Sequence, residues 1–153
     1  MDRLDIRILD SLQQDATLPV SAIAERVGLG TTACWRRIQK LEAEGVVRRR
    51  VVLLDGEKIN AAVSVMVSIR TRSHSAQWLV EFQRAIEAID EVVEAYRMSG
   101  DIDYWLRVVV PDIAAYDAVY KRLIQIEGLT DVSSSFAMEQ LKYTTALPLG
   151  YLK

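Results

Sequence analysis

The spacing of apolar residues changes once along the chain, close to Gly45, and this change limits the folds that the chain can adopt. Before Gly45, apolar residues recur three and four positions apart, the period of amphipathic helices. After it, β-branched runs alternate with further helical stretches. The chain has 153 residues, half of them apolar, which is enough for a very small domain and a medium one. We predict a first domain over residues 1–52, a hinge over 53–60 and a second domain over 61–153.

The first domain is predicted to contain three short helices. Apolar stripes run through residues 2–15, 21–27 and 31–44. Ser21 or a neighbour is expected to cap the second helix, and Gly45 to end the third. Helices this short are marginal in isolation, so we expect the three to share one core in a helix-turn-helix arrangement.

A β-branched run interrupted by three arginines, VVRRRVVLL, follows the third helix at residues 46–54. Such a run favours an extended strand, and the Asp55-Gly56 pair after it is typical of a turn. We therefore expect the run to leave the helices as a strand or wing. The first domain is accordingly predicted to be a winged helix-turn-helix domain.

The second domain alternates strand and helix patterns in the order βαββαβ, which is that of the ferredoxin-like fold. Two helices then cover one face of an antiparallel sheet, and the fold class of the whole chain is α+β. Apolar strands such as VSVMV would leave the other sheet face exposed, so we expect a second subunit to cover it. The predicted strands are 61–71, 92–98, 104–110 and 129–143, and the predicted helices are 75–89 and 113–126.

The charge of the chain is small but unevenly spread. The formal net charge of −2 argues against a protein that coats nucleic acid or membrane with its whole surface. Residues 1–50 carry nine Lys and Arg against seven acids, whereas residues 51–153 carry ten against fourteen. The basic surplus lies between Arg36 and Arg50, which indicates local contact with nucleic acid at one end of the chain.

Several classes of function have little support in the residues. One cysteine and one histidine supply neither an intramolecular disulfide nor a zinc site. Cys34 lies on an apolar stripe and His74 in a polar loop, so neither suggests a nucleophile with its base. No phosphate-binding glycine loop, signal peptide or membrane span is present in the pattern. We expect a cytoplasmic protein that is not an enzyme and holds no cofactor or metal.

The third helix of the first domain suits the major groove of DNA. Its N-terminal residues would meet base edges, while its long cations would neutralise phosphates, although a charged helix is more often just solvated. Arg36 or Arg37 could bind the O6 and N7 atoms of guanine. Trp35 either packs under the first helix, which we favour, or flanks the sugar-phosphate chain. The predicted DNA-binding residues are Ser21, Thr31, Thr32, Ala33, Trp35, Arg36, Arg37, Lys40, Arg48, Arg49 and Arg50.

Four stretches together carry a resemblance to a known family: LDIRILDSLQQDATLPVSAIAERVGL, TTACWRRIQKLEAEGVV, RMSGDIDYWLRVVVPDIAAYDAVYKRLI and GLTDVSSSFAMEQLKYTTALPL. Over nearly its whole length the sequence resembles the Lrp/AsnC family of bacterial and archaeal transcription regulators. TTACWRR and SSFAMEQLKYTTALPL look most like the branch that senses cysteine and controls its degradation. Many relatives have Ser-Pro where this chain has Gly30-Thr31, so the start of the third helix departs from the family pattern.

The resemblance implies a regulator that binds a double-stranded DNA operator and responds to a free amino acid. It also implies homodimers that pair through their sheets and assemble into tetramers or octamers. L-cysteine is the favoured effector, with leucine, methionine or another amino acid as alternatives. A sensor that acts on a protein partner, or a small enzyme that acts at the Asp101-Asp103 hairpin, remain rival hypotheses.

The effector is expected between regulatory domains, near the hairpin from Ser99 to Tyr104. A free amino acid presents an ammonium and a carboxylate, so its pocket needs acceptors as well as backbone N–H donors. Asp101 or Asp103 can accept from the ammonium, and Gly100 leaves backbone N–H groups open, although Gly-Asp is also ordinary hairpin chemistry. The predicted effector-binding residues are Met98, Gly100, Asp101, Asp103, Tyr104, Ser133 and Ser135.

Overall fold

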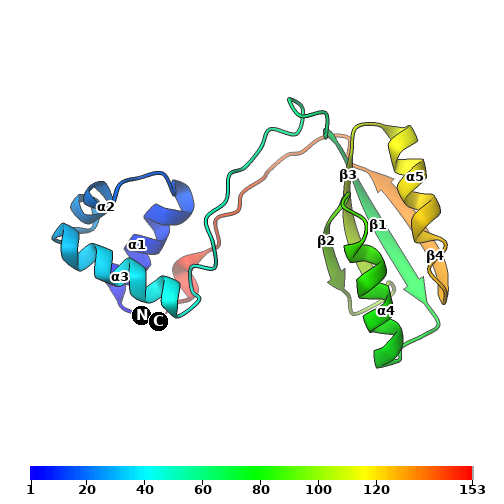
Figure 1. Cartoon of the computed structure of the whole chain (residues 1–153), viewed down its shortest axis with the longest axis horizontal. Coiled ribbons are helices and arrows are strands. Elements are labelled where there is room, and N and C mark those ends of the chain that lie inside the picture. Colours follow the sequence, from blue (N-terminus) through cyan, green and yellow to red (C-terminus); the bar gives the residue numbers. More distant parts are fainter. Residues whose placement is uncertain (153) are drawn as a thin grey trace. The chain divides into compact units, whose positions relative to one another are not determined.

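The structure is a computed structural model that describes residues 1–152, and it divides into two compact units (Figure 1). The helical unit comprises Met1–Leu53 together with the residues from Leu141 onward. The sheet unit comprises Leu54–Gln140. The two-part α+β organisation predicted from the apolar spacing is confirmed.

The helical unit contains α1 (Arg3–Gln14), α2 (Val20–Val27) and α3 (Thr31–Ala43). Their apolar stripes meet in one core, as predicted, because none of these short helices could bury its stripe alone. Gly28 ends α2 in the left-handed conformation with a φ of 76°, which a side chain would disfavour. The buried residues of this core are Ile8, Leu9, Leu12, Ile23, Ala24, Val27, Cys34, Ile38 and Leu41.

Of the caps predicted for α2, Ser21 is wrong. Pro19, not Ser21, is the N-cap residue, and its carbonyl accepts hydrogen bonds from the N–H groups of Ala22 and Ile23. The φ of proline is fixed, at −65° here, and this value suits the start of a helix. Proline has no backbone N–H, but a residue at the start of a helix does not need one for the helical hydrogen bonds. Ser21 is therefore an exposed residue inside the first turn of α2.

The predicted wing is also wrong, because residues 46–54 form no strand and the first strand of residues 1–152 begins at Val63. Val47 folds back on the helices, where its N–H donates to the carbonyl of Leu41 and its side chain packs against the core. A strand needs a neighbour to accept its hydrogen bonds, and this run has none within the helical unit. The first domain is a helix-turn-helix domain without a wing.

The C-terminal segment differs from the prediction as well. The last strand ends at Phe136 rather than at residue 143, and the residues from Leu141 onward group with the helices. The side chain of Gln13 exchanges two hydrogen bonds with the backbone of Leu147, one of 3.0 Å and one of 2.9 Å. Leu149, at the start of the short 3₁₀ helix η1 (Leu149–Tyr151), packs against the helical core.

The sheet unit has the predicted order of elements. Its four strands pair antiparallel in the order β2-β3-β1-β4, and two helices cover one face (Figure 1). Strand alternation sends every second residue of β1 and β3 toward the helices, and those residues are buried. The elements are β1 (Val63–Thr71), α4 (Ala76–Glu87), β2 (Val92–Arg97), β3 (Tyr104–Val110), α5 (Ile113–Leu123) and β4 (Leu129–Phe136).

Aromatic rings fill the space between the sheet and α4. Phe82 stacks on Trp78 with ring centroids 5.1 Å apart and lies 4.6 Å from the ring of Tyr104. The indole N–H of Trp78 donates to the carbonyl of Glu127. A Cβ on Gly128 would lie 2.7 Å from the Nε1 atom of Trp78, so this close approach requires glycine.

Candidate nucleic-acid interface and effector site

Helix α3 buries one side and exposes the other. Cys34, Ile38 and Leu41 form the buried stripe. At 100° per residue, the opposite side carries the residues that we call the exposed face of α3. These residues are Thr32, Arg36, Gln39 and Lys40, and all four are exposed.

Gln39 was absent from the residues predicted from the sequence. It lies three positions after Arg36 and so shares its face, and this spacing was the available signal. Its amide donates to Glu42 over 2.9 Å, an exposed contact that leaves the carbonyl oxygen free of any partner within the described chain. An amide side chain at this place can bind adenine through its N6 and N7 atoms.

The first turn of α3 is open to a ligand's backbone. Thr31, Thr32 and Ala33 are exposed, and the N-cap residue Gly30 supplies no side-chain hydrogen bond. The first N–H groups of the helix therefore lack a side-chain cap. These small exposed residues let the backbone of a DNA strand approach closely.

Trp35 does not pack under the first helix. Half of its surface, 51%, is exposed, which overturns the favoured prediction for this residue. Trp35 follows Cys34 by one position, and that step of 100° carries its side chain out of the buried stripe. The alternative, an aromatic ring that flanks a sugar-phosphate chain, is compatible with this exposure.

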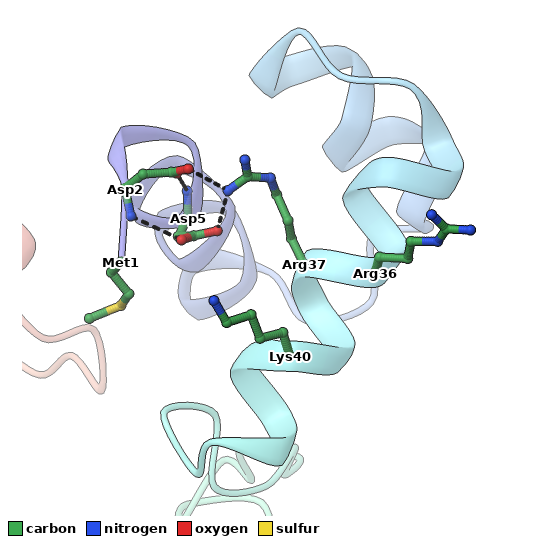
Figure 2. Close-up of a pocket in the computed structure, with 6 residues that line it drawn as sticks. All are labelled: Met1, Asp2, Asp5, Arg36, Arg37 and Lys40. Carbon is green, nitrogen blue, oxygen red and sulfur yellow. Dashed lines mark hydrogen bonds and ion pairs between the residues drawn. The ribbon is translucent and has the colours of Figure 1, made fainter.

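The two neighbouring arginines of α3 have different surroundings. Arg36 points away from α1, whereas Arg37 points toward the start of α1 (Figure 2). The Nη1 atom of Arg37 lies 2.7 Å from a carboxylate oxygen of Asp2 and 2.7 Å from one of Asp5. Of the two candidates for guanine binding, Arg36 has no ion-pair partner among residues 1–152, whereas Arg37 is held in an ion pair.

These ion pairs change the ionisation of the groups involved. The pKa of Arg37 is raised, first by its hydrogen bond with Asp2 and then by that with Asp5. The pKa of Asp2 is lowered, first by the backbone N–H of Asp5 and next by the guanidinium of Arg37. The contact between Arg37 and Asp2 therefore favours the charged form of both groups.

The remaining predicted cations are Lys40, on the exposed face of α3, and three arginines that follow the helix. Lys40 is exposed, with its Nζ atom 3.7 Å from Glu44. Arg50 lies 3.1 Å from Glu42, while Arg48 and Arg49 are exposed and have no ion-pair partner within residues 1–152. These contacts lie on the surface and are weak, so all four cations remain able to exchange their partners for phosphates.

The hairpin of the sheet unit holds Asp103 firmly. Its carboxylate accepts from the N–H of Thr71 over 2.8 Å, and its own N–H donates to the carbonyl of Ile69 over 2.9 Å. Its carbonyl accepts from Met98, which closes the hairpin. Gly100, with a φ of 118°, makes the turn that a side chain would strain. Asp103 therefore has a structural role, and Asp101 is the exposed carboxylate.

The predicted effector residues do not converge within one chain. Tyr104 is only 7% exposed and packs in the aromatic core, so it shapes no open pocket. Ser133 pairs with Ser68 and Ser135 pairs with Met66, which puts both on the sheet face away from the helices. Sequence spacing correctly put the two serines on one face but could not show that Tyr104 faces the opposite way.

The sheet face away from the helices carries large side chains, and we call it the open sheet face. Trp105 and Tyr96 pair across β2 and β3, with ring centroids 5.8 Å apart. Beside them, Arg107 lies 2.6 Å from Glu94. The open sheet face comprises Ser64, Met66, Ser68, Glu94, Tyr96, Trp105, Arg107, Val109, Ser133 and Ser135.

A helix-turn-helix unit with an outward cationic helix, followed by a ferredoxin-like unit, defines a DNA-binding protein with a second, regulatory domain. No described helix is long and apolar enough to cross a membrane. The described residues also contain no group of three His, Cys, Asp or Glu that could hold a metal ion.

Comparisons with known proteins agree with this class. The AsnC-type helix-turn-helix domain matches residues 1–42, and the Lrp/AsnC ligand binding domain matches residues 64–147. The DNA-binding transcriptional activator DecR of Escherichia coli is 47% identical over 97% of this chain and 99% of its own length. The chain therefore belongs to the Lrp/AsnC family, and it is a DNA-binding transcriptional regulator with an amino-acid ligand-binding domain.

Two solved structures have the same fold over the whole chain. An AsnC family transcriptional regulator from Agrobacterium tumefaciens is 63% identical, with a TM-score of 0.96 and full coverage of both chains. A transcriptional regulator from Neisseria meningitidis, solved as a complex with L-Met, is 31% identical, with a TM-score of 0.94 over all of this chain and 99% of its own.

Proposed function

We propose that this regulator binds a double-stranded operator through the exposed face of α3 and that L-cysteine, bound between regulatory domains, changes its affinity for DNA. The observation that carries the first part is the outward, unburied position of Arg36 and Gln39 on a helix whose other side is fully packed. Such a protein acts in the cytoplasm, where the operator is.

The contacts with DNA divide by chemistry. Arg36 and Gln39 are assigned to base edges, because a guanidinium and an amide can each form two hydrogen bonds with a purine. Lys40, Arg48, Arg49 and Arg50 are assigned to phosphates, whose contacts fix position rather than sequence. The small residues of the first turn and Ser21 on α2 complete the interface, with Trp35 beside the sugar-phosphate chain.

We further propose that two copies pair through the open sheet face. Trp105, Tyr96 and Met66 give this face an apolar centre, and an exposed patch of this kind favours a symmetric partner. A dimer would present two α3 helices to half-sites about 34 Å apart, one turn of DNA. Further assembly to tetramers or octamers follows the family pattern.

The effector site is proposed between regulatory domains at the hairpin. Asp101 would accept from the ammonium, the backbone at Gly100 would donate to the carboxylate, and Met98 would contact the side chain. Because Ser133 and Ser135 lie on the open sheet face, they would contribute from the same chain or from its partner. Asp103 and Tyr104 would support the hairpin from within.

L-cysteine is favoured because TTACWRR and SSFAMEQLKYTTALPL resemble the cysteine-sensing branch. Methionine is the second candidate, since the Neisseria meningitidis relative was solved with L-Met. Leucine or another amino acid remains a third. To alter DNA affinity, the effector must bind the operator-bound and free states unequally.

The DNA-binding proposal is tested by the salt dependence of affinity. Operator duplexes would be selected from a random library, and binding measured by fluorescence anisotropy from 50 to 300 mM salt, a range of about sixfold. Arg36→Met should weaken operator binding and relax specificity at one base pair by about 1–3 kcal/mol, whereas Lys40→Met should reduce the salt slope by about one phosphate. Arg84→Met, an exposed arginine on α4, is the matched control and should change neither. Affinity that Arg36→Met leaves unaltered, or that lacks salt dependence, would defeat the proposal.

The effector proposal is tested by thermal shift with each of the twenty amino acids. A ligand that prefers the native protein raises its melting temperature, by an amount equivalent to about 2.7 kcal/mol at 100 times its Kd. L-cysteine should give the largest shift and should change DNA affinity. Binding without an effect on DNA would support a sensor of a protein partner, and consumption of the amino acid would support an enzyme.

A further inference from the structure

Arg37 is attached to α1 by an arrangement that is more than a surface ion pair. Both of its carboxylate partners lie at the start of α1, Asp2 as the N-cap residue and Asp5 in the first turn. We call these two residues the carboxylate pair. Asp5 is only 8% exposed, which is unusual for a carboxylate. Figure 2 shows Arg37 crossing from α3 to this pair while Arg36 points the other way.

Backbone N–H groups hold both carboxylates of the pair in place. One oxygen of Asp2 accepts from the N–H groups of Leu4 and Asp5, at 2.9 Å and 3.0 Å. One oxygen of Asp5 accepts from the N–H of Asp2, also at 2.9 Å. This reciprocal capping box uses one oxygen of each carboxylate and leaves the other for Arg37.

This division of oxygens makes Arg37 the link between two helices. The same Nη1 atom meets the free oxygen of both carboxylates, so the start of α1 and the middle of α3 are joined at one point. A DNA phosphate that took the Nη1 atom of Arg37 would have to displace two fixed anions. Arg36 has no such competitor within the described residues, although the two arginines are chemically identical.

We propose that Arg37 is a positioning residue. Its ion pairs with the carboxylate pair keep it from contacting DNA, and they fix the rotation of α3 about its axis so that Arg36 and Gln39 face the groove. This inference rests on the proposed binding of DNA by α3. Its consequence is unusual for a basic residue of such a helix. Removing Arg37 should leave the number of phosphate contacts unchanged, whereas removing the carboxylate pair should add one.

The test compares three variants by the slope of log affinity against log salt concentration. Arg37→Met should keep the wild-type slope, because Arg37 contacts no phosphate. Asp2→Asn with Asp5→Asn should steepen the slope by about 0.9, the value for one further phosphate, and tighten binding to unrelated DNA. Asparagine keeps the capping ability of residue 2, so α1 retains its start.

A third variant separates the release of Arg37 from the general loss of negative charge. Asp2→Asn and Asp5→Asn in the Arg37→Met background remove the same anions but have no arginine to release. The steeper slope should then disappear, and only a small change in affinity common to both backgrounds should remain. Equal steepening in both backgrounds would overturn the inference.

A positioning role also predicts a loss that plain destabilisation would not cause. At a temperature well below its melting point, Arg37→Met should reduce the preference for operator over unrelated duplex by about tenfold, the loss expected for one misplaced base contact. Arg37→Lys, which keeps the charge, should recover part of it. Unchanged discrimination in Arg37→Met would contradict the role.

The outcomes distinguish this inference from the proposed function. If the wild-type protein shows no salt-dependent binding to any duplex, the proposed function fails, and melting temperatures still test the link. Arg37→Met and Asp5→Asn should then lower the melting temperature by less together than the sum of their separate effects. If the wild type binds DNA but Arg37→Met reduces the slope as the loss of a phosphate-contacting cation such as Lys40 does, only the positioning role is overturned.

Discussion

The two units of the chain differ in how completely one copy presents its chemistry. The helical unit exposes Arg36 and Gln39 on one face of a helix whose other face is fully buried. The sheet unit distributes its predicted effector residues, with Tyr104 in the core and Ser133 on the opposite sheet face. A duplex can be contacted by the surface of one copy, whereas an amino acid must be enclosed. Under the proposed function, DNA contact would therefore need the surface of one copy, whereas effector binding would need a second copy.

The largest expected effect tests whether the two units are separate. Phe82 is 1% exposed and stacks between Trp78 and Tyr104, so Phe82→Ala should destabilise the sheet unit by about 3–5 kcal/mol. Hydrogen exchange followed by mass spectrometry should show faster exchange over residues 63–136 and unchanged protection over residues 3–43. Val80→Ala, an exposed position on the same helix, is the control. Equal loss of protection over residues 3–43 would show that the two units unfold cooperatively.

The next effect sharpens the contrast between the two surfaces. Gln39→Ala should relax discrimination at one base pair by about 1–3 kcal/mol without changing the salt slope, because the amide carries no charge. Gln77→Ala is a matched control, since Gln77 also bonds a glutamate on its own helix, over 3.1 Å, but lies in the sheet unit. Measurement of affinity for operators altered at each position checks this. A uniform weakening over all sequences would assign Gln39 to the phosphates.

Much of this fold could be predicted from the sequence because periodicity records local burial. The spacing of apolar residues located the helices, the strands and their order. It could not show that residues 46–54 form no strand, because a strand needs a hydrogen-bonding neighbour and the sequence of these residues does not specify one. The C-terminal segment was misassigned for a similar reason, since its contact is one side chain, Gln13, far away in the sequence.

The candidate site was predictable only in part. The sequence located the basic helix, but it could not separate Arg36 from Arg37, because the partners of Arg37 lie 35 and 32 positions away. One step of 100° around a helix decides which neighbour is free. The same step brought Trp35 to the surface. The hairpin residues were located by their turn chemistry, whereas the inward direction of Tyr104 depends on the strand register.

A smaller effect concerns the contact of the C-terminal segment. Gln13→Ala removes two partly exposed hydrogen bonds with Leu147 and should destabilise the helical unit by about 1 kcal/mol. Gln14→Ala is the matched control. Gln14 follows Gln13 in the chain and is exposed, and its side chain forms no hydrogen bond within the described residues. Urea unfolding and exchange of the Leu147 amide measure the difference. Equal effects of the two changes would show that the segment contributes no stability to the helices.

The smallest effect is the dependence of the helical unit on pH. The lowered pKa of Asp2 means that folding favours its ionised form, first through the N–H of Asp5 and then through Arg37. The stability it contributes is present above the unfolded carboxyl pKa, about 3.9, and is lost as pH falls through the lower folded value. Because Asp2 is exposed, solvent screening keeps this contribution small. Melting curves of the helical signal from pH 6 downward, through the window set by the unfolded pKa of about 3.9, should decline less steeply for Asp2→Asn than for the wild type. Parallel curves would show that folding does not favour the ionised form of Asp2 and would weaken the contrast drawn between Arg36 and Arg37.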